Sequence, residues 1–220
     1  MLKNARLILV PVALLFLLQA CKTTSPMRQD GAMNNPDSVA KAFGLLYYKQ
    51  GMEMMNASSY KQALYYFRQA EPYINTGRAF NKQDRATLQN AFGKAYYYEG
   101  ATDSARARFE LAVEHDSLDA EAYNNIGYMA FIDRNYDRAL VFYQKALALN
   151  PRYDTAKENI ELIRRFQSGD LSWEVYGLFE KAEKIDNLEE QIALYTKMVQ
   201  ASPLYSDAYN NLSVALFYSG

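Results

Sequence analysis

The sequence contains a single cysteine and a single histidine, which removes most of the chemistry that enzymes and metalloproteins use. Cys21 alone can form neither a disulfide framework nor a cysteine-rich metal site. His115 has no second histidine or suitably placed cysteine to complete a zinc site or a catalytic pair. No glycine-rich phosphate loop occurs either. We therefore expect no enzyme activity, no cofactor, no metal site and no small-molecule substrate.

The chain also lacks an excess of either charge, because it has 24 basic and 25 acidic residues. Nucleic-acid backbones are bound by basic surfaces, so we expect no nucleic-acid partner. What the chain has in abundance is tyrosine, with 19 residues beside 11 phenylalanines and one tryptophan. Tyrosine suits half-buried positions, where the ring packs inward and the hydroxyl reaches water. The composition therefore predicts thin layers with a large surface rather than one thick core.

The first residues have the features of a targeting segment rather than of a folded domain. Lys3 and Arg6 precede an apolar run over residues 7–18. That run is shorter than the roughly 20 residues that a membrane-spanning helix needs. A basic start, a short apolar stretch and small residues are typical of a secretory signal peptide. We expect residues 1–20 to be that peptide.

The end of this segment, Leu18-Gln19-Ala20-Cys21, resembles the lipobox of bacterial lipoproteins. The resemblance implies that Cys21 receives acyl chains, palmitate among them, and anchors the mature protein in a bacterial membrane. Several acyl chains on one residue give stable attachment. Lys22 stands where aspartate favours inner-membrane retention in these families, so we expect the outer membrane, with the protein facing the periplasm. Residues 21–37, rich in Thr, Ser, Pro, Asn and Gly, are predicted to be a flexible tether.

The rest of the chain repeats with a period of about 34 residues. In the clearest copy, residues 120–153, small and aromatic side chains recur on one face of each of two helices, and a proline ends the second helix. These positions are Tyr123, Ile126, Gly127, Tyr136, Ala139, Tyr143, Ala146 and Pro151. Gly127 and Ala139 are small where two helix backbones must approach closely. The pattern predicts a pair of antiparallel helices in each copy.

This unit resembles the tetratricopeptide repeat. The resemblance implies an all-α fold, an α-solenoid of antiparallel helix pairs that forms a superhelix. We expect an array over residues 38–168, with copies at 44–77, 86–119 and 120–153 and an extra helix at 154–167. Residues 78–85 fit a longer loop or an extended helix end. A degenerate copy follows at 172–205, and a half repeat at 206–220. The half repeat carries many apolar residues, so we expect a longer natural protein or a partner to cover it.

In the tetratricopeptide-repeat family the first helices line a concave groove that binds partner segments. By that resemblance the groove residues here are Asn90, Lys94, Tyr97, Tyr98, Glu121, Asn124, Tyr128, Phe131, Asn210 and Phe217. Asparagine can pair with a peptide backbone, and aromatic residues favour interfaces. An alternative is that Phe131 packs against the next helix. Thr155 and Asn159 stand where some family members place basic residues that bind a C-terminal carboxylate, so we do not predict that activity.

Together these patterns predict an adaptor or assembly scaffold in the bacterial cell envelope. It would be anchored through Cys21 and would bind other envelope proteins in its groove. Three alternatives remain open at this point, one of which is a purely structural lipoprotein with no specific partner. The array could be the recognition arm of a longer envelope enzyme or transporter that continues past residue 220, or it could regulate cell-wall enzymes.

Overall fold

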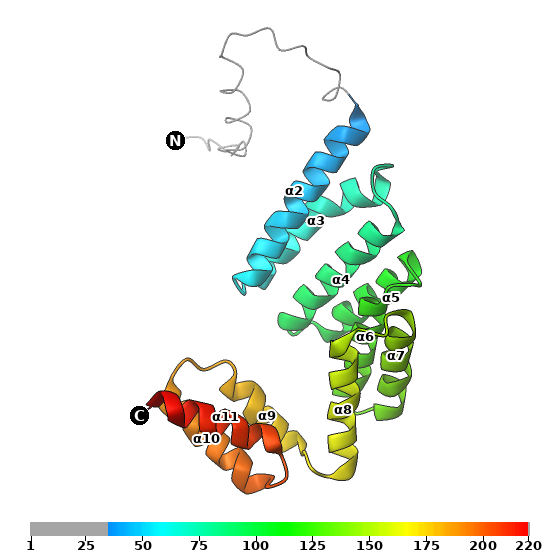
Figure 1. The fold of residues 1–220 in the computed structure, drawn as a ribbon. Coiled ribbons are helices and arrows are strands. Elements are labelled where there is room, and N and C mark those ends of the chain that lie inside the picture. The colour runs from blue at the N-terminus through cyan, green and yellow to red at the C-terminus, as the bar shows by residue number, and fades with distance from the viewer. Residues whose placement is uncertain (1–34, 220) are drawn as a thin grey trace, which may run out of the picture.

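The computed structural model describes residues 35–219, and every regular element in that range is an α-helix. Figure 1 shows the helices stacked in chain order into a curved body whose C-terminal helices turn back toward its middle. The helices are α2 (Pro36–Asn56), α3 (Tyr60–Thr76), α4 (Lys82–Tyr98), α5 (Thr102–His115), α6 (Ala120–Ile132), α7 (Tyr136–Leu149), α8 (Asp154–Ser168), α9 (Trp173–Ala182), α10 (Leu188–Ala201) and α11 (Ser206–Ser219). The predicted all-α superhelix is confirmed.

Side chains in the short loops fix where several helices begin. Asn81 accepts a hydrogen bond from the backbone N–H of Asp84, and the Asp84 carboxylate accepts one from the Asn81 N–H. This reciprocal capping box satisfies two donors that the first turn of α4 leaves free. Asp119 caps α6 and Asn135 caps α7 in the simpler one-sided way. These polar residues explain why the chain breaks into short paired helices.

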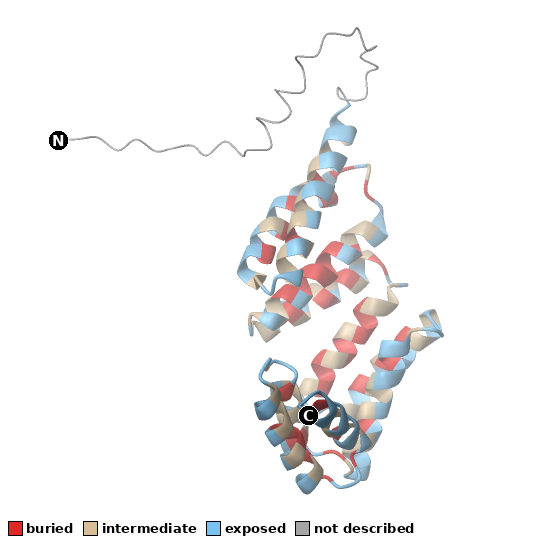
Figure 2. Cartoon of the chain, turned by 60° about the vertical axis from the view of Figure 1, so that its left-hand side comes forward, coloured by how far each residue is buried: buried red, intermediate tan, exposed pale blue. Residues whose placement is uncertain are grey.

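In each of the helix pairs α2/α3, α4/α5 and α6/α7, a glycine of the first helix packs against an aromatic ring of the second. A Cβ on any of these glycines would overlap the ring, so the close approach needs the missing side chain. The pairs are Gly51 with Phe67, Gly93 with Phe109 and Gly127 with Tyr143. Figure 2 shows the buried residues concentrated on the facing sides of the helices.

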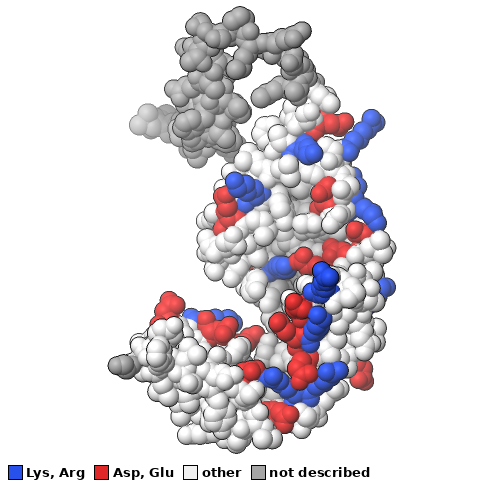
Figure 3. Space-filling model, viewed as in Figure 1, with Lys and Arg blue, Asp and Glu red and all other residues white. Residues whose placement is uncertain are grey.

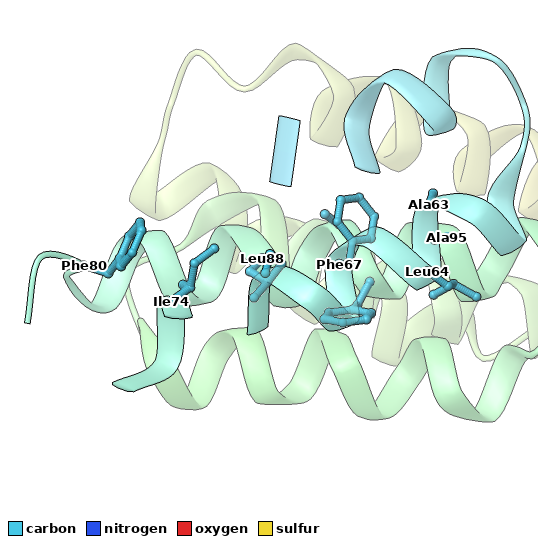
Figure 4. Packing of buried hydrophobic residues seen from close by; sticks show 10 residues of the cluster. Ala63, Leu64, Phe67, Ile74, Phe80, Leu88 and Ala95 are labelled. Atoms are coloured by element: carbon cyan, nitrogen blue, oxygen red, sulfur yellow. The ribbon is translucent and has the colours of Figure 1, made fainter. Parts of the chain in front are cut away.

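The hydrophobic core runs along the stack as a series of small clusters. The first lies between α3 and α4, with α2 over it, and Figure 4 shows its side chains in a row along the helices. Its labelled members are Ala63, Leu64, Phe67, Ile74, Phe80, Leu88 and Ala95. Further clusters follow between α5 and α7 and around α8. This layered burial is what a solenoid of neighbouring repeats requires.

A polar network links helices α3, α4 and α5. The Arg108 guanidinium on α5 donates to Glu71 on α3 at 2.5 Å and to Gln89 on α4 at 2.7 Å. The Gln89 amide, fully buried, also donates to Glu71 at 3.3 Å. The same guanidinium lies 4.1 Å from the centre of the Phe92 ring. Buried polar groups here are therefore paired across the layers rather than left unsatisfied.

The last three helices form a unit with its own core, joined to the stack through a sharp turn after α8. Gly169 there has φ +84°, a left-handed conformation that suits glycine. Across the joint, Arg165 donates to Asp207 at 2.5 Å. Trp173 donates from its indole nitrogen to the Tyr136 hydroxyl at 2.9 Å. These two contacts hold the unit beside α7 and α8.

One predicted boundary differs from the structure. The tether was predicted to extend to residue 37, but α2 begins at Pro36 because Asn35 caps it by accepting from the Asp37 N–H. Residues 78–85, expected to be a longer loop or an extended helix end, hold a short loop and the first residues of α4, which begins at Lys82. The predicted signal peptide, Cys21 and the tether up to residue 34 lie outside the described residues. Between residues 35 and 219, no helix has the length and apolar character needed to cross a bilayer.

Candidate partner-binding groove

A groove of about 650 Å³ lies between α4, α6 and the opposing helix α9. Figure 3 shows the surface hollowed here, between the C-terminal helices and the main stack. It is lined by Lys94, Tyr97, Tyr98, Gly100, Thr102, Phe109, Asn125, Tyr128, Met129, Tyr176, Phe179, Glu180, Glu183 and Lys184. The turn after α8 carries α9 across from α6, so the groove has two walls instead of one concave face.

Tyr97 and Tyr128 form the centre of the inner wall. Their hydroxyl oxygens lie 2.9 Å apart, and their rings meet edge to face with centroids 5.4 Å apart. Burial is the main cause that raises the pKa of Tyr97 above its ordinary value of 10.0, and the hydrogen bond with Tyr128 raises it further. Burial likewise raises the pKa of Tyr128, and it raises that of Tyr176 on α9 to about 12. All three hydroxyls therefore stay protonated near neutral pH and can donate hydrogen bonds.

Tyr98 gives the groove an exposed aromatic edge. Its side chain is 57% exposed, and its ring stacks on Tyr60 with centroids 4.9 Å apart. Phe179, half-buried on α9, supplies a second apolar surface on the opposite wall. Half-exposed aromatic residues with a supported ring are the kind that dominate protein interfaces.

The charges around the groove are largely paired. Lys94 of α4 forms a salt bridge with Glu121 of α6, which ties two neighbouring repeats together across the concave face. On α9 the Lys184 ammonium lies 3.7 Å from Glu180. Both pairs are solvent-exposed, so they contribute little to stability. The groove consequently offers aromatic surface and hydrogen-bond donors rather than a strong field of one sign.

Asn90 and Asn124 were predicted to face a partner, and the structure corrects this. Their side chains are only 2% and 5% exposed. The Asn125 amide donates to Asn90 Oδ1 at 3.3 Å, and the Asn159 amide donates to Asn124 Oδ1 at 3.0 Å. Neither side chain is available on the groove surface, because each joins its own first helix to the next one in the stack.

Phe131 is also corrected, in favour of the packing alternative. Its side chain is 1% exposed and lies at the centre of an aromatic cluster that joins α6 to α9. Its ring is 5.1 Å from that of Trp173 and 5.4 Å from that of Phe166, measured between centroids. The lone tryptophan therefore belongs to the joint that positions the outer groove wall.

The remaining predicted residues fall in two places. Lys94, Tyr97, Tyr98 and Tyr128 line the groove, and Glu121 borders it through its ion pair. Asn210 and Phe217 on α11 are exposed but do not line it. The C-terminal unit turns α9, not α11, toward the array. Whether a partner binds at these residues stays a prediction.

Several groove residues were missed by the sequence reasoning. Asn125 lines the groove, whereas the adjacent Asn124 is buried. The helical periodicity of the sequence alone could not show which of the two asparagines faces the groove. Tyr176, Phe179, Glu180 and Glu183 come from α9, whose place depends on the turn at Gly169. No sequence signal gives the angle of that turn. Among residues 35–219 no group of three or more His, Cys, Asp or Glu side chains is arranged to hold a metal ion.

Comparison with known proteins agrees with the repeat fold. Residues 120–153 match the sequence profile of the tetratricopeptide repeat. Over 113 residues the chain is 26% identical to the tetratricopeptide repeat-containing protein trd-1 of Caenorhabditis elegans. That match covers 51% of this chain but only 12% of the relative. The region shared with trd-1 is thus a small part of that protein.

Two solved structures show the same fold. The tetratricopeptide-repeat domain of Arabidopsis OM64 superimposes with a TM-score of 0.51 at 18% identity, over 58% of this chain and 98% of that one. The Cut9–Hcn1 hetero-tetramer of the APC/C gives a TM-score of 0.50 at 19% identity, over 55% of this chain and 23% of that one. The chain therefore folds as a tetratricopeptide-repeat solenoid, and its third helix pair carries the recognisable repeat sequence.

Proposed function

We propose that this protein is a membrane-anchored adaptor or assembly scaffold of the bacterial cell envelope, which binds a segment of another envelope protein in the groove. The observation that carries the proposal is the two-walled groove, with an exposed aromatic side chain at Tyr98 on one wall and a half-buried one at Phe179 on the other. Tetratricopeptide-repeat folds are built for protein–protein contact, because stacked helix pairs present an extended concave surface.

The groove chemistry favours a peptide segment with apolar side chains. Tyr98 and Phe179 offer apolar surface on facing walls, so an apolar residue of the partner can be desolvated between them. Tyr97 and Tyr128 use one hydroxyl proton between them, so the pair offers one hydroxyl donor, and Asn125 offers an amide oxygen, for the main chain of such a segment. Paired charges at the rim would set orientation more than affinity.

The anchor rests on sequence. Leu18-Gln19-Ala20-Cys21 resembles a lipobox, and Lys22 in place of aspartate favours the outer membrane with the array in the periplasm. Cys21→Ser should move the protein from the membrane fraction to the soluble periplasmic fraction and abolish labelling with radioactive palmitate. Membrane attachment that survives this change would contradict the lipid anchor while leaving the groove proposal untouched.

The groove is tested by crosslinked affinity capture from cells, with Tyr98→Ala/Phe179→Ala beside the unmodified protein. The matched control is Tyr65→Ala/Val141→Ala, because Tyr65 is also 57% exposed and Val141 is exposed, yet neither lines the groove. We expect an envelope protein to be lost from the groove variant and retained by the control. Equal capture by both variants would place the partner site elsewhere.

A further inference from the structure

The outer wall of the groove carries carboxylates among its aromatic residues. Tyr176, Glu180 and Glu183 follow one another on α9 at spacings of four and three residues, so they share one face of that helix, and all three line the groove. Figure 3 shows acidic side chains on the C-terminal helices at the edge of this hollow. The Glu180 side chain is 40% exposed, so a ligand in the groove can reach its carboxylate.

Glu180 lies close to aromatic residues of both walls. Burial is the main cause that raises the pKa values of three groove tyrosines, and the negative charge of Glu180 raises each of them further. These residues are Tyr97 and Tyr128 on the inner wall and Tyr176 on the outer wall. The Lys184 ammonium, 3.7 Å from Glu180, belongs to a side chain that is 75% exposed. A surface pair of this kind contributes little, so a better-placed cation can replace Lys184.

The other charges of the groove leave the outer wall with an excess of carboxylate. Lys94, on the inner wall, is held by Glu121, which does not line the groove. Lys184 is then the one cation beside two carboxylates, those of Glu180 and Glu183. Of the described residues that line the groove, none is an arginine. The groove therefore combines several aromatic rings with one carboxylate in excess.

Two other places in the chain show which residue completes such a combination. Arg108 donates to Glu71 at 2.5 Å, and its guanidinium lies 4.1 Å from the centre of the Phe92 ring. A second set has the same composition, with a donor–acceptor distance of 2.5 Å and a guanidinium 5.6 Å from the ring centre: Arg165, Asp207 and Tyr205. In both sets one arginine contacts an aromatic ring and a carboxylate at the same time.

A guanidinium suits this combination better than an ammonium does. It is planar, so it stacks on an aromatic ring, and it can donate two parallel hydrogen bonds to one carboxylate. The negative face of each ring also attracts the positive charge. An arginine side chain in the groove would therefore make both kinds of contact that Arg108 and Arg165 make elsewhere.

We propose that the groove selects a partner segment that carries an arginine, whose guanidinium packs on the groove tyrosines and pairs with Glu180. An apolar residue of the same segment contacts Tyr98 and Phe179. The inference rests on the proposed function, because it names the chemistry of the segment that the groove binds. Charge complementarity at Glu180 supplies the specificity, and the aromatic surface supplies the contact area.

The test uses a phage-displayed library of short random peptides, selected on the detergent-solubilised full chain. Groove ligands are the selected peptides whose binding is weakened by Tyr98→Ala/Phe179→Ala, a criterion that does not involve Glu180. The proposal predicts that these peptides carry arginine more often than the unselected library does. Replacing that arginine by citrulline, its neutral isostere, should raise the Kd of the peptide by about tenfold or more.

Glu180→Gln tests the pairing from the side of the protein, since it removes the charge and keeps the shape. The variant should bind the arginine peptides about tenfold more weakly, and citrulline should then change Kd by less than about twofold, because the two groups act as a pair. Glu174→Gln is the matched control, because it removes an exposed carboxylate from the same helix outside the groove. It should leave Kd unchanged. Circular dichroism checks that each variant keeps its fold.

The remaining outcomes separate this inference from the proposed function. Groove ligands that lack arginine, or that bind equally well with citrulline, would overturn the inference and leave the groove as the partner site. Equal weakening by Glu180→Gln and Glu174→Gln would also overturn it, because general charge attraction would then explain the effect. Recovery of no peptide that depends on Tyr98 and Phe179 would overturn the groove itself and the arginine proposal with it.

Discussion

The Cβ position of Gly127 lies 2.7 Å from ring carbon Cδ1 of Tyr143, which leaves no room for a side chain between α6 and α7. Gly127→Ala should therefore force the two helices apart and lower the free energy of unfolding by about 1–3 kcal/mol. The measurement is urea denaturation followed by far-ultraviolet circular dichroism. Gly177→Ala is the matched control, because a Cβ there meets nothing within 4 Å. It should be neutral or stabilising by about 0.5–1 kcal/mol, since alanine is the better helix former. Equal effects of the two changes would contradict the packing of the third repeat.

The link between Arg108, Glu71 and Gln89 should matter more than the surface ion pairs. Arg108→Met removes both donors and leaves the buried Gln89 oxygen without its partner, so we expect a loss of about 1–3 kcal/mol. Arg164→Met removes an exposed pair with Glu161 at 3.3 Å and should cost under about 0.5 kcal/mol. Thermal melts of the two variants beside the parent make the comparison. Similar melting temperatures for both variants would argue against a role for the network.

Lowering the pH should weaken the stabilising contact between Lys82 and Asp116. The Lys82 ammonium, 3.0 Å from Asp116 Oδ1, holds the pKa of that carboxyl below its ordinary 3.8. A depressed folded-state pKa means that ionised Asp116 stabilises the fold above about pH 4, and that this contribution is lost as the pH falls through the lower folded-state value. Asp116→Asn should therefore be less stable than the parent at pH 7, by a margin that shrinks toward about pH 3.

The control for that experiment is Asp154→Asn, because its pair with Lys157 is exposed. It should show little difference from the parent at either pH. Comparing variants also separates Asp116 from its neighbour Asp119, whose pKa is shifted in the opposite direction because burial raises it. A stability difference for Asp116→Asn that stays constant between pH 7 and pH 3 would show that the carboxyl is not held by Lys82.

The aromatic joint should control the outer wall of the groove. Phe166 contacts Phe131 and Trp173, with centroids 5.4 and 4.8 Å apart, so Phe166→Ala should loosen the C-terminal unit. Hydrogen exchange should speed up in α9 by at least tenfold while α4 keeps its protection. Phe142→Ala, which removes a ring stacked on Tyr123 within the third repeat, is the comparison and should leave α9 unchanged. Uniform loss of protection in both variants would mean that the unit is not a separate element.

The repeated unit could be predicted from the sequence because the residues that determine it lie within one helix pair. The small–aromatic spacing of Gly127 and Tyr143, and the polar caps at Asp119 and Asn135, act within one helix pair and are readable from one copy. Which residues of a helix are buried was harder to predict from the sequence. Asn124 and Asn125 are adjacent, and a difference of one helical position decides that the first is buried and the second lines the groove.

The outer groove wall could not be predicted for a different reason. It depends on the direction in which the chain leaves Gly169 and on how Trp173 packs against Phe131, which are contacts between segments distant in sequence. The degenerate copy lacks the small residues that fix helix spacing in the other repeats. Its orientation is therefore set by tertiary packing, and Phe179 enters the site only as a result of that packing.

The most direct test of the central claim is the affinity of the groove for the segment of the captured partner, measured by isothermal titration calorimetry. We predict that Tyr98→Ala/Phe179→Ala raises Kd at least tenfold, which corresponds to about 1.4 kcal/mol. The Tyr65→Ala/Val141→Ala control should keep the Kd of the parent, because its side chains are exposed but lie outside the groove. An unchanged Kd for the groove variant would contradict the assignment of this groove as the partner site.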